Sequence, residues 1–91
     1  MAWLFDQISS LGSSRGLNSP PATAQFCRIQ ANGQAVRFRL DGGVPTATVG
    51  ERLTAGGDVL ELNDLGDMLN FRAIEEASGA TLACHFQLSR V

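Results

Sequence analysis

Apolar and polar positions alternate along most of the chain from residue 23 onward, as they do in β-strands with one buried face. The longest such run is the last one, at residues 80–88, and its apolar positions are Leu82, Cys84, Phe86 and Leu88. Further strands are expected at residues 26–30, 35–40, 59–62 and 71–75, with an extended or edge segment at 44–50. Glycine-rich turns separate these runs. The pattern predicts an all-β fold, a small antiparallel β-sandwich or barrel of about six to seven short strands.

An Asn-Gly pair, Asn32-Gly33, lies between two of these strands. Asn-Gly is the strongest short hairpin signal, because a type I′ turn needs positive φ at both central residues. A two-residue loop would place Cys27 and Ile29 on an apolar side of the hairpin. It would also place Arg28 directly opposite Arg37 on the other side. The sequence therefore predicts a hairpin with one core-facing side and one basic side.

Three guanidinium groups, those of Arg28, Arg37 and Arg39, would share this basic side. Like charges that face each other across strands are destabilising unless something neutralises them. One source of neutralisation is the acidic second half of the same chain, for example Glu61 or Glu75 on a neighbouring strand. The other is the anionic surface of a partner. Both interpretations stay open from the sequence.

The first 22 residues differ from the rest. Their apolar residues recur at a helical spacing and are Leu4, Phe5, Ile8 and Leu11. A stretch rich in Ser and Gly and then Pro20-Pro21 break any regular element. We expect residues 1–22 to form a short N-terminal helix or an extended arm on a flexible linker, and residues 23–91 to form the β domain. The arm would dock either on its own domain or on a neighbouring subunit, since so short a helix is marginal alone.

Charge and length restrict the classes of partner. The chain has 91 residues and a formal net charge of −2, and all its cationic residues are arginines. A slightly acidic balance argues against a nucleic-acid partner. No window approaches the roughly 18 apolar residues that a membrane span needs, and the start of the chain lacks the pattern of a secretory signal. We therefore expect no membrane association.

Residues that could carry catalysis or bind a metal are few. Cys27 and Cys84 match no zinc-binding spacing, and they are either buried free thiols or a disulfide. The single histidine, His85, follows Cys84 on a strand, so the two side chains point to opposite faces. A Cys–His nucleophile pair within that strand is thus disfavoured. We expect no enzyme activity, no metal and no cofactor.

Much of the chain resembles small β-rich proteins encoded among the structural genes of tailed bacteriophages and prophages. The resemblance covers about residues 24–88, leaves out the N-terminal 22 residues, and rests mainly on turns and core positions. The segments that carry it are IQANGQAVRFRLDGG (29–43), PTATVG (45–50), the single residue Leu53, AGGDVLEL (55–62), NFRAI (70–74) and GATL (79–82).

The resemblance implies a non-enzymatic structural protein of the virion, foremost one that decorates or stabilises the capsid. Such a protein would be made in the cytoplasm of the bacterial host and bind the major capsid protein or another virion protein. A homo-oligomer is expected, with a trimer favoured, because its symmetry would match sites on a shell. A tail or fibre attachment protein and a small ligand- or carbohydrate-binding β module remain alternatives. The arm and the basic side supply the expected partner-binding residues: Trp3, Leu4, Phe5, Ile8, Arg28, Arg37 and Arg39.

Overall fold

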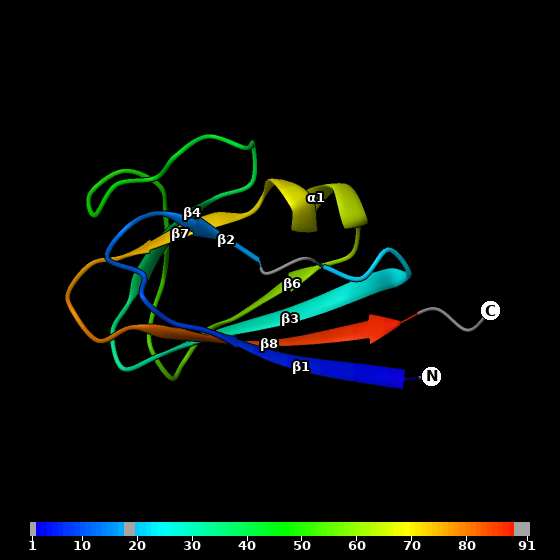
Figure 1. Cartoon of the computed structure of the whole chain (residues 1–91). Coiled ribbons are helices and arrows are strands. Elements are labelled where there is room, and N and C mark those ends of the chain that lie inside the picture. The colour runs from blue at the N-terminus through cyan, green and yellow to red at the C-terminus, as the bar shows by residue number, and fades with distance from the viewer. Residues whose placement is uncertain (1, 18–19, 89–91) are drawn as a thin grey trace.

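The computed structural model describes residues 2–17 and 20–88, and these form an all-β fold of two antiparallel four-stranded sheets (Figure 1). Residues 1, 18–19 and 89–91, which the expected arm, linker and β domain include, lie outside the described residues. The first sheet, in spatial order, consists of β1 (Ala2–Ile8), β8 (Thr81–Leu88), β3 (Ala24–Asn32) and β6 (Val59–Leu62). The second sheet consists of β2 (Arg15–Gly16), β7 (Arg72–Glu75), β4 (Val36–Arg39) and β5 (Glu51–Leu53). One helix, α1 (Leu65–Asn70), lies between β6 and β7.

The strand order is that of a jelly roll. Strand β1 pairs with β8, β2 with β7, β3 with β6 and β4 with β5, and every one of these pairs is antiparallel. The chain thus follows one long hairpin that is folded over on itself, so that alternate parts of it fall in the two sheets. Backbone hydrogen bonds hold the crossings together, among them the one from the Glu75 amide to the Leu11 carbonyl. The expected sandwich is confirmed, and its six strands from Ala24 onward are joined by β1 and β2.

The N-terminal segment is a strand and not a helix. Strand β1 pairs with β8 over its whole length, from Ala2 opposite Leu88 to Ile8 opposite Leu82. The spacing that suggested a helix also fits a strand, because Leu4 and Ile8 point to the same face in both. As a strand, β1 forms backbone hydrogen bonds with the edge of β8. A helix of one or two turns would leave that edge of β8 unpaired and would itself be only marginally stable. Residues 2–17 are therefore part of both sheets and do not form a separate arm.

The predicted hairpin at Asn32-Gly33 is wrong. Strand β3 pairs with β6 and β8, whereas β4 pairs with β5 and β7, so the segment between β3 and β4 crosses from one sheet to the other. Gly33 does have the positive φ that the turn signal implied, at 82°. Because of this crossing, the apolar side of β3 faces the second sheet and the apolar side of β4 faces the first sheet. The two apolar sides are therefore more fully buried than they would be in one exposed hairpin. Arg28 and Arg37 consequently lie on different sheets and are not opposed.

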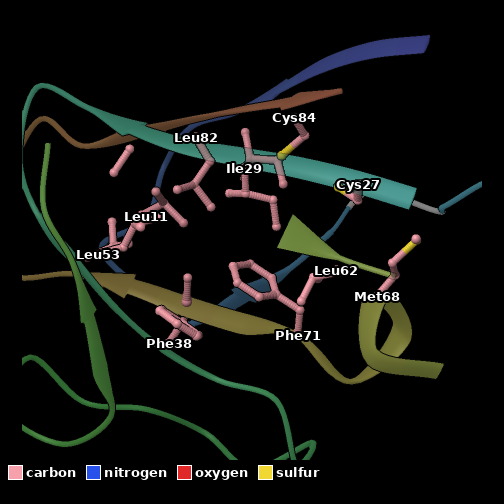
Figure 2. Packing of buried hydrophobic residues seen from close by; sticks show 14 of the residues in the cluster. Leu11, Cys27, Ile29, Phe38, Leu53, Leu62, Met68, Phe71, Leu82 and Cys84 are labelled. Atoms are coloured by element: carbon pink, nitrogen blue, oxygen red, sulfur yellow. The ribbon is translucent and has the colours of Figure 1, made fainter. Parts of the chain in front are cut away.

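The core lies between the two sheets (Figure 2). Most positions that alternation assigned to it are buried, including Cys27 and Ile29 on β3 and Cys84 on β8, whereas Leu88 at the end of β8 is only partly buried. The rings of Phe38 and Phe71 stack at a centroid distance of 5.8 Å on the second sheet's side. The side chain of Met68 on α1 and those of Ile8 and Leu11 near the N-terminus complete the cluster.

Candidate functional site

The outer face of the first sheet gathers an unusual set of exposed side chains. Alternation sends the side chains of Trp3 and Phe5 on β1 to this face, because the odd positions of β1 lie opposite the outward positions of β8. Phe5 lies opposite His85, and His85 lies opposite Arg28 on β3. Phe26 is two positions before Arg28 on the same side. We call Trp3, Phe5, Phe26, Arg28 and His85 the aromatic–arginine patch.

The rings of the patch contact one another. The Trp3 indole meets the ring of Phe26 edge-on, with centroids 6.2 Å apart, and the His85 imidazole edge-on at 6.3 Å. The ring of Phe5 lies closer to His85, at 4.8 Å. Aromatic pairs at these separations attract one another beyond their shared burial. Trp3 and Phe5 nevertheless remain 51% and 53% exposed, so the cluster holds its shape while presenting apolar surface to solvent.

Arg28 carries the positive charge of the patch. Arg28 is exposed, and among the arginines of the described residues it alone has a side chain with no hydrogen bond or ion pair to another described residue. Glu61 on β6 lies opposite it in register, without an ion pair between them within the described part of the chain. The guanidinium is therefore available to donate hydrogen bonds to a carboxylate or another anionic group from outside the molecule.

Two shallow hollows open on the same face. One has a volume of about 150 Å³, and its lining includes Arg28, Gln30, Val59 and His85. The other has a volume of about 290 Å³ and is lined by Trp3, Arg28 and His85. Both are smaller than the pockets of roughly 300–1,000 Å³ that enclose drug-sized ligands. The face is thus a surface with indentations around Arg28 and not a deep binding cavity.

The structure brings together only part of the set of partner-binding residues expected from the sequence. Trp3, Phe5 and Arg28 meet on one face through β1, β8 and β3. Leu4, near the N-terminal end of β1, points to the opposite face of the sheet and remains 46% exposed. Ile8 is only 1% exposed and packs in the core, so the expectation that it contacts a partner is wrong. Its burial follows from alternation along β1, which turns it towards the second sheet.

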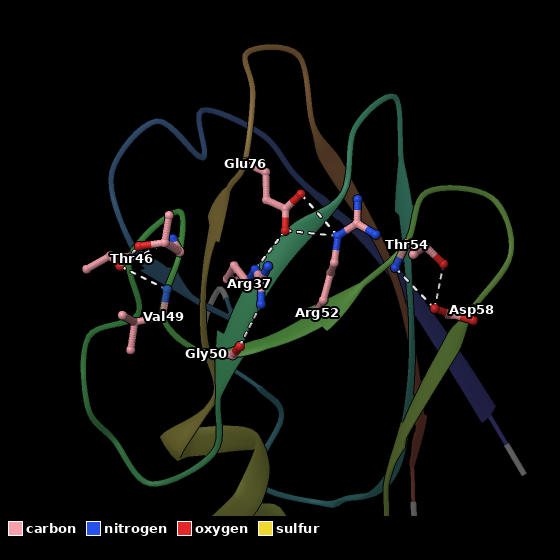
Figure 3. Close-up of polar contacts among 9 residues, drawn as sticks. Arg37, Thr46, Val49, Gly50, Arg52, Thr54, Asp58 and Glu76 are labelled. Carbon is pink, nitrogen blue, oxygen red and sulfur yellow. Dashed lines mark hydrogen bonds and ion pairs between the residues drawn. The ribbon is translucent and has the colours of Figure 1, made fainter.

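Arg37 and Arg39 lie on the second sheet and already have carboxylate partners. The Nε atom of Arg37 donates to Glu76 at 2.7 Å (Figure 3), and Arg39 donates through Nε to Asp41 at 3.0 Å. The hydrogen bond from the Arg39 guanidinium is the main cause that lowers the pKa of Asp41 from 3.8 to about 2. Acidic residues of the same chain therefore neutralise these two arginines, which answers the question that the sequence left open for them.

Phe26 and His85 belong to the patch but were not among the residues expected from the sequence. Alternation already turned both of them outward, in the opposite direction to Cys27 and Cys84. What the sequence lacked was the pairing of β3 with β8, which sets His85 beside Arg28. No local sequence pattern predicts the register between two strands that are distant along the chain.

The described residues offer little for other kinds of site. No group of three or more His, Cys, Asp or Glu side chains among them is arranged to hold a metal ion. A more open hollow of about 470 Å³ lies beside the second sheet, where its lining includes Phe38, Arg39 and Asp41, and here Arg39 already pairs with Asp41. No helix of the described residues is long and apolar enough to cross a membrane.

Comparison with known proteins adds no relative: no family model matches the chain, and no match was found among curated proteins or solved structures.

Proposed function

We propose that this chain is a non-enzymatic structural protein of a bacteriophage virion, one that decorates and stabilises the capsid and docks on a shell protein through the aromatic–arginine patch. The observation that carries the proposal is the exposed aromatic cluster around Arg28, whose side chain has no hydrogen bond or ion pair to another described residue. Tryptophan, other aromatics and arginine are the residue types that dominate the energetics of protein interfaces. The partner surface would combine an apolar patch with a carboxylate that pairs with Arg28.

The fold and the sequence add support of a more general kind. Jelly rolls occur in viral capsid proteins, but also in lectins, so the architecture alone does not select a function. The resemblance of residues 24–88 to β-rich proteins of tailed phages favours the viral role. Many copies on a shell would need only a modest affinity each, which suits an exposed patch with no deep pocket.

The first test asks where the protein resides. Virions released by the strain that carries the gene are purified by density gradient and probed with an antibody against the recombinant chain. The proposal expects the protein in intact particles and in isolated heads. Its absence from particles would overturn the proposal, whereas its presence in tails alone would identify the tail or fibre attachment protein instead.

The second test asks which face docks. Particles assembled without the protein are mixed with recombinant chain and sedimented. We expect Trp3→Ala and Arg28→Ala to weaken co-sedimentation about tenfold or more, since truncating an interface anchor typically costs over 1 kcal/mol. Leu69→Ala is the matched control, because Leu69 is 64% exposed on α1, away from the patch. Equal binding by all three variants would remove the patch as the docking face.

A carbohydrate-binding module is the second candidate, and the hollows beside Trp3 and Arg28 favour it. Aromatic rings with hydrogen-bonding groups at their edge, here Arg28 and Gln30, are the usual lining of sites that hold small polar ligands. The test is electrophoresis of the native chain through gels that contain dextran, xylan or soluble chitin derivatives. Retardation of the wild type but not of Trp3→Ala would support this function, and unchanged mobility in every gel would remove it for these polysaccharides.

A further inference from the structure

Strand β1 is the exposed edge of the first sheet. It pairs with β8 on one side, and no described strand pairs with it on the other (Figure 1). The other three sheet edges are short: β6 has four residues, β5 has three, of which two are charged, and β2 has two. Strand β1 has seven residues, contains no Pro, Lys or Arg, and carries a single charge, that of Asp6 on its inner side. A long edge with so little protection is a template for pairing with another strand.

The N-terminal half of β1 is apolar on both faces of the sheet. Trp3, Leu4 and Phe5 are consecutive and exposed by 51%, 46% and 53%. Trp3 and Phe5 point to the outer face of the sheet, whereas Leu4 points to the inner side, opposite Phe86. Consecutive exposed apolar residues on a strand are costly in solution unless another surface covers them. A strand added alongside β1 would cover both sides at once.

We propose that β1 pairs in an antiparallel manner with β1 of a second copy of this chain, which joins the two first sheets into one continuous sheet. The two-fold axis would pass beside Leu4. Leu4 of each copy then lies opposite Leu4 of the other, and Trp3 lies opposite Phe5 of the second copy. Aromatic pairs directly across an antiparallel ladder are among the stabilising cross-strand pairs.

The single charge of β1 favours this register. Asp6 is the only ionisable side chain within Ala2–Ile8. A two-fold axis at Leu4 places each Asp6 opposite position 2 of the other strand, so the two carboxylates are about 13 Å apart along the ladder. An axis at Asp6 would set the carboxylates directly opposite each other, and an axis at Phe5 would set Leu4 opposite Asp6. Both alternatives are less favourable.

A second copy fits this edge because the strand is complementary to itself. A two-fold contact uses the same surface of both chains and closes after two copies, so it consumes the edge and does not extend into a fibre. It would also set the two aromatic–arginine patches side by side on one face. The inference does not depend on the proposed function, because it concerns the isolated chain.

The test is the mass of the full chain in solution, measured by light scattering and sedimentation equilibrium over a range of concentrations. We expect a reversible dimer of twice the 9.7 kDa of one chain. Leu4→Glu and Leu4→Lys, each alone, would place like charges on the axis and give monomers, and an equimolar mixture of the two would restore the dimer. Leu69→Glu changes a still more exposed leucine, on α1, and should leave the dimer intact. A monomeric or trimeric wild type would overturn the inference; a monomer would leave the edge to a strand of another protein.

A cross-linking variant tests the register without the need for a charge change. Residues opposite each other in an antiparallel pair have Cα separations that suit a disulfide. Leu4→Cys should therefore form a covalent dimer with oxidised glutathione, whereas Gln7→Cys, farther along β1, should not. The native Cys27 and Cys84 are buried and do not interfere. Cross-linking through Gln7→Cys, or no cross-linking of a folded Leu4→Cys, would overturn the proposed register.

Discussion

Arg37 on β4 and Arg52 on β5 lie directly opposite each other in the second sheet, and one carboxylate, that of Glu76, joins them (Figure 3). The Nε atom of Arg37 is 2.7 Å from Oε2 of Glu76, and the Nε atom of Arg52 is 3.0 Å from the same oxygen. Arg37 also donates through Nη1 to the carbonyl of Gly50. Two like charges that would otherwise repel across the ladder are thus bridged by the residue that directly follows β7.

We predict that Glu76→Gln destabilises the protein at neutral pH, because it leaves Arg37 and Arg52 opposed without an anion. The hydrogen bond from Arg52 is the main cause that lowers the pKa of Glu76 below its ordinary 4.5. A carboxylate whose pKa is lowered by folding stabilises the fold fully above about pH 4.5. This contribution to stability is lost as the pH falls through the pKa of the folded state. The gap between the melting temperatures of wild type and variant should therefore shrink below pH 4.5.

The matched control for this prediction is Glu51→Gln, which removes an exposed carboxylate from β5, for which the structure describes no ion pair. Its melting temperature should stay close to that of the wild type throughout. Thermal unfolding followed by circular dichroism between pH 7 and pH 3 provides the measurement. If Glu76→Gln lowers the melting temperature equally at every pH, the carboxylate does not act through its charge.

Gly33 and Gly56 form a matched pair for a test of the crossings between the sheets. Both have positive φ, 82° and 73°, which costs a residue with a Cβ about 1–2 kcal/mol. A Cβ on Gly33 would also strike the carbonyl oxygen of Gly79, whereas a Cβ on Gly56 would meet open space. We expect Gly56→Ala to lower the free energy of unfolding only by this backbone strain. Gly33→Ala should lose a further ~1–3 kcal/mol from overpacking.

Urea unfolding of the two glycine variants measures this difference directly, through the free energy of unfolding at constant slope. Equal losses for Gly33→Ala and Gly56→Ala would mean that the turn after β3 can move away from Gly79. The close approach of the two crossings would then contribute little to the specificity of the fold.

The positions that face the core could be predicted from the sequence, whereas the partners of each strand could not. Alternation correctly turned Cys27 and Phe86 inward and His85 outward, because it depends only on the geometry of a single strand. The Asn32-Gly33 signal predicted the positive φ of Gly33 correctly, but Asn32 belongs to β3 without a positive φ, and no hairpin follows. A turn of this composition can close a hairpin or carry the chain to the other sheet, and burial of both strands decides between them.

The candidate site was predicted only in part for the same reason. Trp3, Phe5 and Arg28 were expected to bind a partner, but their meeting depends on β1 pairing with β8 and β8 with β3. These contacts join residues from opposite ends of the chain. The apolar spacing of the N-terminal segment fitted both a helix and a strand, and the free edge of β8 decides in favour of the strand.

Removal of the first 22 residues should unfold the protein. The truncation takes one strand from each sheet and removes Ile8 and Leu11 from the core, and both are at most 1% exposed. A milder variant, Ile8→Ala, should lower the free energy of unfolding by about 2–5 kcal/mol. Gln7→Ala, its exposed neighbour on β1, should stay within about 0.5 kcal/mol of the wild type. Far-ultraviolet circular dichroism and urea titration provide the measurements.

The truncation experiment separates two interpretations of the N-terminus. A chain of residues 23–91 that keeps its β spectrum and a cooperative unfolding transition would show that the N-terminal segment is a dispensable arm. A spectrum without β structure, together with a normal fold for Gln7→Ala, would show that β1 and β2 are needed to complete the sheets.

Cys27 and Cys84 are free thiols on adjacent core strands, and both should resist modification in the native protein. Burial is the main cause that raises the pKa of each from 9.0 to about 12. At pH 8 a rise of this size lowers the reactive thiolate fraction about a thousandfold. Ellman's reagent should therefore detect almost no thiol in the folded chain and both thiols in urea. The exposed variant Thr48→Cys should add one rapidly reacting thiol and serves as the control.

The same thiols should make the fold less stable in alkali. Because the folded-state pKa values lie above the ordinary value, the stabilisation is complete below about pH 9 and is lost as the pH rises towards 12. Cys27→Ala and Cys84→Ala should each flatten part of this decline, since alanine does not ionise. A single rapidly reacting thiol in the native wild type would mean that one of the two strands opens to solvent. Fewer than two thiols in urea without reductant would mean that Cys27 and Cys84 form a disulfide.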